Sequence, residues 1–326
     1  MKNPVSRRPR LSAGTSMLAL LLFPMAVGAA DQPYPNRPVR LVTAAAGGGN
    51  DFAARMIAPG LTEKLGQQVI VDNRGGAHVP ANLVAKAAPD GHTILVQNNT
   101  IWVAPLLEKT AYDHFRELAP LMLTGRAPNV LVVHPSLPVG SVKELIAAAK
   151  AAPGTINYAS GVAGSSNHVA AELFKALAGV DLVRISYKGS GPALIDVMAG
   201  QVKLIFSTTT SSMNHVKTGK LKALAITSAQ RSDLAPGLPT VAESGVPGYV
   251  AEAIYGVWLP AKTPAPIMKR LHEDIVQVLT TPQVKERFVT TGAEIVASTP
   301  EVFAAEIKAE STRLEKIFRS AGIKAE

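Results

Sequence analysis

The chain has no cysteine among its 326 residues. A protein without thiols cannot be a disulfide scaffold, use a thiolate nucleophile or hold a metal through cysteine. An oxidising compartment stays open to such a chain, because it contains no thiol that could be misoxidised. The seven histidines form no H-x-x-x-H or H-E-x-x-H pair, so they offer no alternative set of metal ligands. We therefore expect no bound metal.

Aromatic residues make up only 5% of the chain, and no segment after residue 30 is rich in lysine or arginine. The sequence therefore gives no support for nucleic-acid binding. In contrast, a hydrophobic content of 47% is sufficient for packed cores and excludes an intrinsically disordered chain. The length of 326 residues suggests about two domains at the usual ~100–200 residues each.

Long hydrophobic runs are also missing. The uninterrupted apolar run Met17–Val27 is shorter than the ~20 residues that span a bilayer. It follows four basic residues within the first ten positions and precedes the small residues Gly28-Ala29-Ala30. This order predicts a secretory signal peptide over residues 1–30, cleaved near Ala30. Its removal takes away no acidic residue, so the formal charge falls from +9 to +5.

Strand-like and helix-like segments alternate along the first part of the remaining chain. Residues 39–43, 69–71 and 93–96 are short strand-like runs, and helical patterns over about 51–65 and 81–87 lie between them. Glycine follows the first of these helices, as expected at a helix C-terminus. This alternation predicts an α/β fold with a parallel sheet and helices on both of its faces.

A second series of the same kind begins near Asn129 with the strand Val130–Val133. Ser141-Val142-Lys143-Glu144 is a capping box that predicts a helix start. Two α/β lobes are therefore expected, with no flexible linker between them. The final helix, about Pro300–Ser320, is expected to pack back onto the first lobe.

The first candidate site is the turn Ala46-Gly47-Gly48-Gly49-Asn50-Asp51, between a strand and a helix. Glycines let the backbone approach an anion, which the first N–H groups and the helix dipole then hold. A dinucleotide-binding loop is the alternative, with Asp72 as its acid, but Phe52 stands where the third glycine of G-x-G-x-x-G belongs. A tight turn with Asn50 or Asp51 as the helix N-cap is a purely structural interpretation.

The second candidate site is the serine-rich segment from Ala159 to His168, again between a strand and a helix. Its small residues expose backbone N–H groups, and the hydroxyls of Ser160, Ser165 and Ser166 could donate to a carboxylate. A serine hydrolase would need a serine within a G-x-S-x-G turn, with an acid and a base later in the chain. None of these serines lies in such a motif. We therefore expect no catalytic residue, and we interpret His168 as a side chain that hydrogen-bonds within its helix start.

Other residues add less to the functional interpretation. Lys188 follows a strand and could steer anions into a cleft or simply be solvated. Trp102 and Trp258 are expected in the core. Together these observations predict an exported protein of two α/β lobes, with anion-binding turns in both and no catalytic set. A ligand held between lobes that close by hinge motion accounts for that combination.

Many short motifs in a fixed order make the chain resemble a known family. The motifs are Tyr34-Pro35-Asn36-Arg37-Pro38, Gly47–Asp51, Asp72-Asn73-Arg74, Ala85–Gly91, Pro135-Ser136-Leu137-Pro138, Tyr158-Ala159-Ser160, Tyr187-Lys188-Gly189, Gly219-Lys220-Leu221 and Leu238–Glu243. Over essentially the whole mature region, the chain resembles the Bug or TctC family, the extracytoplasmic solute receptors of tripartite tricarboxylate transporters.

The resemblance implies a type II periplasmic binding-protein fold, with a ligand cleft between lobe 1 (31–131 and 252–326) and lobe 2 (132–251). It implies a periplasmic monomer that is not an enzyme, needs no cofactor, binds an organic carboxylate and delivers it to transporter membrane subunits. The ligand-binding residues expected from the turns and the resemblance are Ala44, Gly48, Asn50, Asp51, Gly76, Ala77, Asn98, Ser160, Gly164, Ser165, His168 and Ser207.

Departures from the family pattern bear on ligand size. Ala44, Ala45 and Ala46 replace the family's phenylalanine and two prolines, and the segment after Arg74 is about two residues short. These changes predict a wider pocket and a bulkier ligand, such as an aromatic or longer-chain diacid, unless Trp102 fills the space. Lys203 replaces a common aspartate and would favour a second ligand anion if it points inward.

Two other functional classes remain open from the sequence. One is an exported nucleotide-dependent enzyme on a similar α/β fold. The other is an orphan ligand sensor that serves a histidine kinase instead of a transporter.

Overall fold

The computed structural model describes Met1 and residues 34–320, apart from residues 77, 234 and 291. Most of the predicted signal peptide and the candidate site residue Ala77 therefore lie outside the described residues. The chain from Tyr34 onward forms one compact unit. Within its described part, no helix is both long and apolar enough to cross a membrane.

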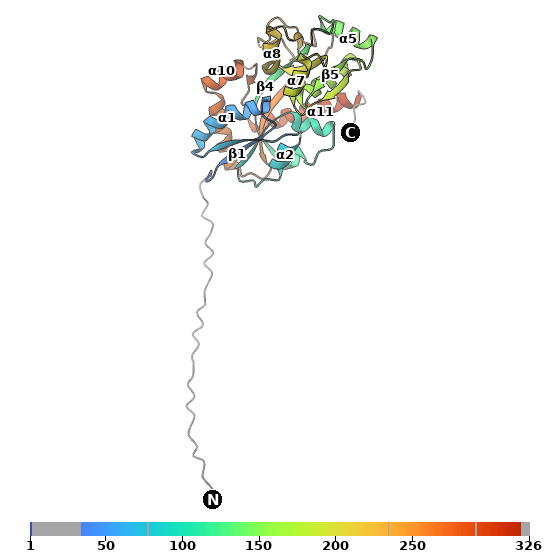
Figure 1. Cartoon of the computed structure of the whole chain (residues 1–326). Helices are drawn as coiled ribbons and strands as arrows, with labels where there is room; N and C mark the ends of the chain where they lie inside the picture. Colours follow the sequence, from blue (N-terminus) through green and yellow to red (C-terminus); the bar gives the residue numbers. More distant parts are fainter. Residues whose placement is uncertain (2–33, 77, 234, 291, 321–326) are drawn as a thin grey trace. The chain divides into compact units, whose positions relative to one another are not determined.

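The first part of the sheet is parallel, as the strand–helix alternation predicts (Figure 1). Strand β1 (Val39–Thr43) lies between β2 (Val69–Asn73) and β3 (Thr93–Asn98) and is parallel to both. Helices α1 (Gly49–Leu65) and α2 (Val79–Ala85) connect these strands. The three short helices that follow are α3 (Thr100–Val103), η1 (Ala104–Leu106) and α4 (His114–Glu117).

The second part repeats the pattern. Its strands are β5 (Asn157–Ser160), β6 (Val183–Ser186), β7 (Leu204–Thr208) and β8 (Lys222–Ile226). Its helices are α5 (Val142–Ala151), α6 (Ser166–Ala178), α7 (Ser190–Met198) and α8 (Thr209–Lys217). Strand β5 pairs in parallel with both β6 and β7. Helix α8 and strand β8 are not among the elements that the sequence patterns predicted.

Two strands connect these parts, β4 (Leu118–Val133) and β9 (Glu252–Pro260), and they run antiparallel to each other. β9 is also antiparallel to β3, and β4 is antiparallel to β7 and β8. The sheet, ordered β2-β1-β3-β9-β4-β7-β5-β6, is therefore mixed. The predicted parallel pairing is confirmed for β1 with β2 and β3, and the two connecting strands add antiparallel pairs that the alternation does not predict. Residues 130–133, predicted as a strand of their own, are only the end of β4, which pairs with β9 over residues 118–128.

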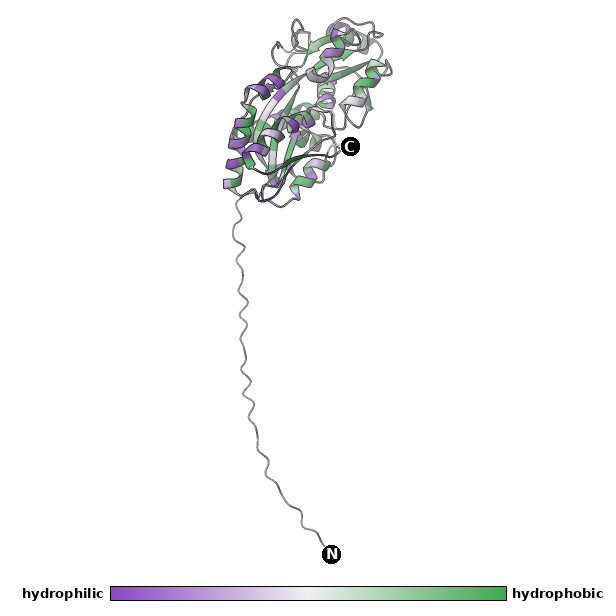
Figure 2. Ribbon diagram, turned by 60° about the vertical axis from the view of Figure 1, so that its left-hand side comes forward, coloured by the Kyte–Doolittle hydropathy of each residue, from purple (hydrophilic) through white to green (hydrophobic). Residues whose placement is uncertain are grey.

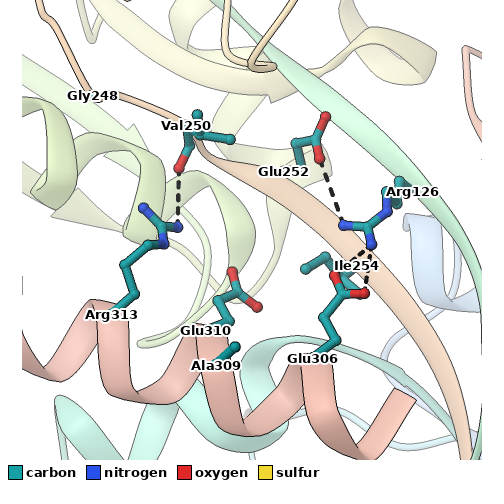
Figure 3. Close-up of a pocket in the computed structure, with 9 residues that line it drawn as sticks. All are labelled: Arg126, Gly248, Val250, Glu252, Ile254, Glu306, Ala309, Glu310 and Arg313. Atoms are coloured by element: carbon teal, nitrogen blue, oxygen red, sulfur yellow. Dashed lines mark hydrogen bonds and ion pairs between the residues drawn. The ribbon is translucent and has the colours of Figure 1, made fainter. Parts of the chain in front are cut away.

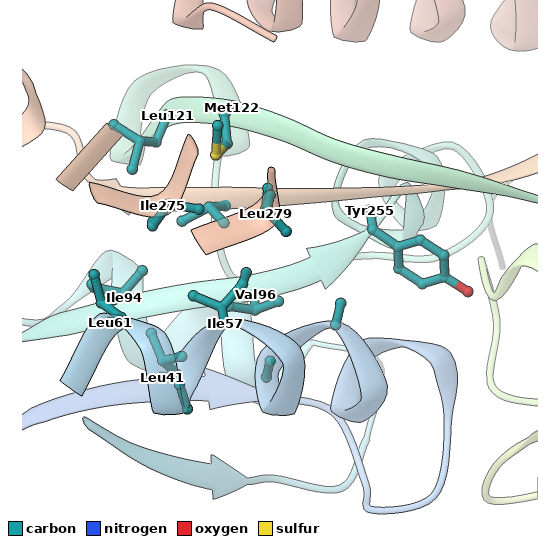
Figure 4. Packing of buried hydrophobic residues seen from close by; sticks show 14 of the residues in the cluster. Leu41, Ile57, Leu61, Ile94, Val96, Leu121, Met122, Tyr255, Ile275 and Leu279 are labelled. Atoms are coloured by element: carbon teal, nitrogen blue, oxygen red, sulfur yellow. The ribbon is translucent and has the colours of Figure 1, made fainter. Parts of the chain in front are cut away.

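Four C-terminal elements complete the fold: α9 (Ala265–Leu279), α10 (Pro282–Thr290), β10 (Glu294–Ile295) and α11 (Pro300–Ser320). One face of the first part buries a cluster that α1 and α9 share with the strands (Figure 4). The opposite face buries a cluster formed with α2, α3 and α11. Phe303 and Phe318 of α11 lie in that cluster, so the predicted return of the last helix is confirmed.

Both tryptophans belong to this second cluster. Trp102 and Trp258 are almost fully buried, with ring centroids 6.1 Å apart, which confirms that they are core residues. The hydropathy pattern agrees with the burial pattern: the strands are largely hydrophobic and the helices expose hydrophilic faces (Figure 2).

Two helix ends follow the sequence signals closely. Gly66 adopts the left-handed conformation with φ +64°, and its N–H donates to the Thr62 carbonyl at 3.0 Å. At the start of α5, the Ser141 hydroxyl accepts from the N–H of Glu144 at 3.2 Å. The Glu144 carboxylate in turn accepts from the N–H of Gly140 at 2.6 Å. A standard capping box would use the N–H of Ser141, so the capping box is confirmed with this bond shifted by one residue.

Candidate functional site

The turn between β1 and α1 leaves a helix start without a side-chain cap. Gly48 is the N-cap residue and has no side chain to offer, so the interpretation of Asn50 or Asp51 as the N-cap is wrong. The N–H groups of Gly48, Gly49 and Asn50 have no acceptor among the described residues. The dipole of α1 adds positive potential at the same point. The turn therefore presents free hydrogen-bond donors where an anion would be stabilised.

Asp51 holds this turn in shape. Its carboxylate accepts from the N–H of Gly47 at 3.0 Å, from Arg55 Nε at 2.9 Å and from Asn73 Nδ2 at 2.8 Å. Burial opposes ionisation, but these hydrogen bonds outweigh it and hold the pKa of Asp51 below its ordinary value. Asn73 also donates to the Ala44 carbonyl at 2.8 Å. Asp51 is thus an ionised residue whose carboxylate ties the turn to α1 and β2.

Strand β3 ends beside the same turn. Asn98 pairs in register with Tyr255 of β9, and its side-chain oxygen accepts from the N–H of Thr100 at 3.2 Å and from its hydroxyl at 2.6 Å. Tyr255 is 4% exposed and points toward the start of α1. A Cβ added to Gly49 would lie 2.7 Å from Cζ of Tyr255 and closer still to the hydroxyl oxygen.

The sequence analysis did not identify Tyr255 as a site residue. Its surroundings, Ala253-Ile254-Tyr255-Gly256-Val257, resemble any buried strand, and residues of that strand do lie in the core. Its pairing with Asn98 depends on the antiparallel position of β9, which the alternation of strands and helices does not reveal. The run of three glycines before Asn50 was the one available signal, because it includes a position where no side chain fits.

In the serine-rich segment several polar groups hydrogen-bond to one another. Ser160 donates to the Gly161 carbonyl at 3.1 Å and accepts from Arg184 Nε at 2.8 Å. The Ser165 hydroxyl donates to Asn167 Oδ1 at 2.6 Å. That same oxygen accepts from the backbone N–H of Gly161 at 3.2 Å. The segment is therefore pre-organised by its own hydrogen bonds.

His168 contributes to the same network. Its Nδ1 accepts from the N–H of Gly164 at 3.1 Å, as expected for a histidine that hydrogen-bonds within its helix start. Burial, with smaller effects from Arg184 and Lys175, lowers the pKa of His168 to about 3, so the ring is neutral. Gly164 has φ +73°, and a Cβ there would lie 2.8 Å from Cα of Ala104 in η1. The serine-rich segment therefore packs directly against the first part of the fold.

The remaining candidates are dispersed. Gly76 has φ +98° and lies in the loop between β2 and α2. Ser207 of β7 is buried, and its hydroxyl has no partner among the described residues. Asn129 on the neighbouring strand β4 is also fully buried, with neither side-chain polar atom hydrogen-bonded within the described chain. Orphaned polar atoms of this kind commonly mark places for water or a ligand.

Three further polar side chains are engaged elsewhere. Lys203 donates to the Gly200 carbonyl at 3.1 Å, at the start of β7, whereas Ser207 lies near the carboxyl end of that strand, so the condition that Lys203 points inward is not met. His78 contacts the carboxylate of Glu108. Asp72 is paired with Arg40 and Arg74.

A separate charged pocket of about 390 Å³ lies between α11 and the connecting strands (Figure 3). Its lining residues are Arg126, Gly248, Val250, Glu252, Ile254, Glu306, Ala309, Glu310 and Arg313. Arg126 pairs with Glu306 at 2.5 Å, and Arg313 donates to the Val250 carbonyl at 3.2 Å. With three carboxylates against two guanidinium groups, this pocket suits an organic anion less well than the start of α1.

Glu310 is the most perturbed acid in this pocket. Its carboxylate accepts from Trp102 Nε1 at 2.9 Å. Burial raises the pKa of Glu310 to about 7, although Arg313 and the hydrogen bond from Trp102 act in the opposite direction. Burial likewise raises the pKa of Glu252. The described residues contain no group of three or more metal-ligating side chains.

The fold, two α/β parts joined by antiparallel connecting strands, is that of the periplasmic binding proteins. Residues 53–323 match the sequence profile described as tripartite tricarboxylate transporter family receptor, TctC, and the chain belongs to this family. It is 36% identical over 297 residues to protein BugT of Bordetella pertussis, covering 89% of this chain and 91% of BugT. This confirms the resemblance noted from the motifs.

Solved structures agree with this assignment. The R. palustris protein Rpa4515 with adipate is 34% identical, with TM-score 0.85, covering 90% of this chain and 100% of that one. The periplasmic binding protein BugD is 33% identical, with TM-score 0.84 over 90% of this chain and 100% of BugD. MatC (Rpa3494) from Rhodopseudomonas palustris with bound malate is 29% identical, with TM-score 0.82 over 87% of this chain and 99% of MatC.

Proposed function

We propose that this protein is a periplasmic receptor that captures an organic carboxylate and delivers it to the membrane subunits of a tripartite tricarboxylate-type transporter. The observation that carries the proposal is the uncapped start of α1, where Gly48, Gly49 and Asn50 leave their N–H groups without acceptors among the described residues. Such a group of donors binds small anions, among them carboxylates, without needing a basic side chain.

The relatives support this ligand class. Rpa4515 is described with adipate and MatC with bound malate, and both share the fold of this chain. The name of BugD supports a periplasmic location, which in this chain would follow cleavage of the signal peptide near Ala30. The protein acts as a monomer in this proposal. Its lobes, residues 31–131 with 252–326 and residues 132–251, close on the ligand.

The small residues of the β1–α1 turn favour a ligand larger than a four-carbon diacid. Ala45 and Ala46 are exposed, so the turn lacks the bulk that prolines would supply. Trp102, the side chain expected to fill such a gap, is instead buried against Trp258 on the face of α11. A longer-chain or aromatic diacid is therefore the preferred ligand within the carboxylate class.

Calorimetric titration of the mature protein with malate, succinate, adipate and terephthalate tests ligand class and size together. Adipate or terephthalate should bind most tightly, and binding should raise the melting temperature by several degrees at ~100-fold excess over Kd. Tightest binding of malate or succinate would overturn the larger ligand while keeping the receptor. Turnover or tight binding of a nucleotide, with no response to any acid, would overturn the receptor itself.

Delivery to a transporter needs a separate test. Proteoliposomes containing the cognate membrane subunits should accumulate the labelled acid only when the liganded receptor is added. Stimulation of a histidine kinase without any effect on uptake would instead identify a sensor.

A further inference from the structure

Tyr255 differs from every other tyrosine of the protein. The chain has six tyrosines, all within the described residues. Five of their hydroxyls donate to a protein acceptor. The pairs are Tyr34 to the Gly91 carbonyl, Tyr112 to the Ile101 carbonyl, Tyr158 to Glu172, Tyr187 to Asp196 and Tyr249 to the Ala170 carbonyl. The Tyr255 hydroxyl has no hydrogen-bond partner among the described residues. Its residue is only 4% exposed, but the hydroxyl oxygen is not one of the fully buried unpartnered atoms, so the oxygen itself is accessible. A tyrosine whose ring is buried normally finds a protein partner for its hydroxyl, so this one calls for an explanation.

The position of the Tyr255 hydroxyl explains why it has no partner within the protein. The ring packs with the apolar cluster under α1, and its oxygen points away from the aliphatic side chains (Figure 4). It lies at Gly49, the first residue of α1, so closely that a Cβ there could not be accommodated without moving the ring. The hydroxyl is therefore held beside the free N–H groups of Gly48, Gly49 and Asn50.

We propose that Tyr255 is a ligand-binding residue whose hydroxyl donates a hydrogen bond to the ligand carboxylate held at the start of α1. This inference rests on the proposed function and adds a residue to its site. Burial raises the pKa of Tyr255 above its usual range, so the hydroxyl stays protonated wherever a carboxylate is ionised. The neutral hydroxyl can donate a hydrogen bond to an anion without adding a charge to the site. Because the tyrosine ring is rigid, it loses little conformational entropy on binding.

The arrangement also explains why position 49 must be glycine. A side chain at Gly49 would displace the ring, and with it the oxygen that completes the donor set. Gly48 carries no such constraint, because a Cβ there would meet nothing closer than the Ala45 carbonyl at 3.9 Å. The glycine run thus contains one position fixed by Tyr255 and a neighbour that is sterically open.

The test compares Tyr255→Phe with Tyr249→Phe in the full mature protein, using whichever acid of the calorimetric panel binds the wild type most tightly. Tyr255→Phe should leave the melting temperature of the unliganded protein unchanged, because no internal hydrogen bond is lost. It should weaken binding by roughly 10- to 100-fold, the usual effect of removing a hydrogen bond to a charged group. Tyr249→Phe removes the 2.9 Å bond to Ala170, so it should lower the melting temperature and leave affinity unchanged.

Two outcomes overturn the inference while the receptor proposal stands. One is equal affinity of wild type and Tyr255→Phe. The other is a drop in the melting temperature of unliganded Tyr255→Phe comparable to that of Tyr249→Phe, which would show that the hydroxyl has a structural partner. If the wild type binds no acid of the panel, the result contradicts the proposed function itself, and the inference about Tyr255 is then wrong as well.

Discussion

The β1–α1 turn and the serine-rich segment look alike in sequence, since both place small and polar residues between a strand and a helix. In the structure they differ. The turn keeps the N–H groups of Gly48, Gly49 and Asn50 without acceptors. In the serine-rich segment, by contrast, the N–H groups of Gly161 and Gly164 and the hydroxyls of Ser160 and Ser165 are hydrogen-bonded within the chain. Free donors are what a ligand can use, and satisfied ones are what holds a surface in shape. We therefore expect hydrogen bonds from the turn to contribute binding free energy, and the serine-rich segment to hold the shape of the surface that faces the ligand.

The largest effect should come from substituting the glycine that Tyr255 constrains. Gly49→Ala would place a Cβ 2.7 Å from Cζ of Tyr255, and overpacking of this kind typically costs about 1–3 kcal/mol. We expect a lower melting temperature and loss of carboxylate binding, measured by thermal unfolding and calorimetry. Gly48→Ala is the matched control and should unfold at the wild-type temperature. Equal melting temperatures for the two variants would contradict this packing argument.

The next effect concerns His168 and acid. Its pKa of about 3 lies below the ordinary value of 6.5, so the folded state binds fewer protons than the unfolded state between these values. Stability should therefore fall as the pH drops from about 6.5 toward 3, by at most about 1.4 kcal/mol per pH unit from this group. His168→Gln, which retains an acceptor for Gly164, should show a shallower fall in urea unfolding across that range. Identical slopes for variant and wild type would show that His168 is not buried neutral.

The smallest effects should separate two N-cap serines. Ser141 caps α5 through the N–H of Glu144, whereas Ser165, at the start of α6, makes no capping bond to its helix. Ser141→Ala should lower stability by about 0.5–2 kcal/mol and leave affinity unchanged. Ser165→Ala should change both by less, because its hydroxyl bonds only to Asn167. A large loss of affinity in Ser165→Ala would instead show that the serine-rich segment binds the ligand directly.

Local signals in the sequence predicted local structure well. Gly66, the capping box at Ser141 and the helix beginning at Pro300 each depend on a few neighbouring residues, and all three are found. The family could be inferred too, because its motifs are short and ordered. The mixed sheet could not, since pairing between β3 and β9 joins residues about 160 positions apart, and a strand does not record its partner's direction.

The candidate site shows the same limit. Its turn was predicted because glycines before a helix have a local meaning. Tyr255 could not be predicted, because its role depends on where β9 lies relative to α1. The direction of Lys203 could not be predicted for a related reason: it is set by the place of Lys203 just before β7, where its side chain reaches Gly200. Which of the nominated residues contact a ligand stays a prediction.

The hydrogen bond from Trp102 to Glu310 gives this protein a built-in optical probe. The chain has only two tryptophans, and both lie on the face of the sheet covered by α11. Because the pKa of Glu310 is about 7, the acceptor of the Trp102 indole gains a negative charge near neutral pH. Intrinsic emission should therefore titrate around pH 7 in the wild type and stay flat in Glu310→Gln. A label-free spectrum can thus report the ionisation of the charged pocket separately from events at the start of α1.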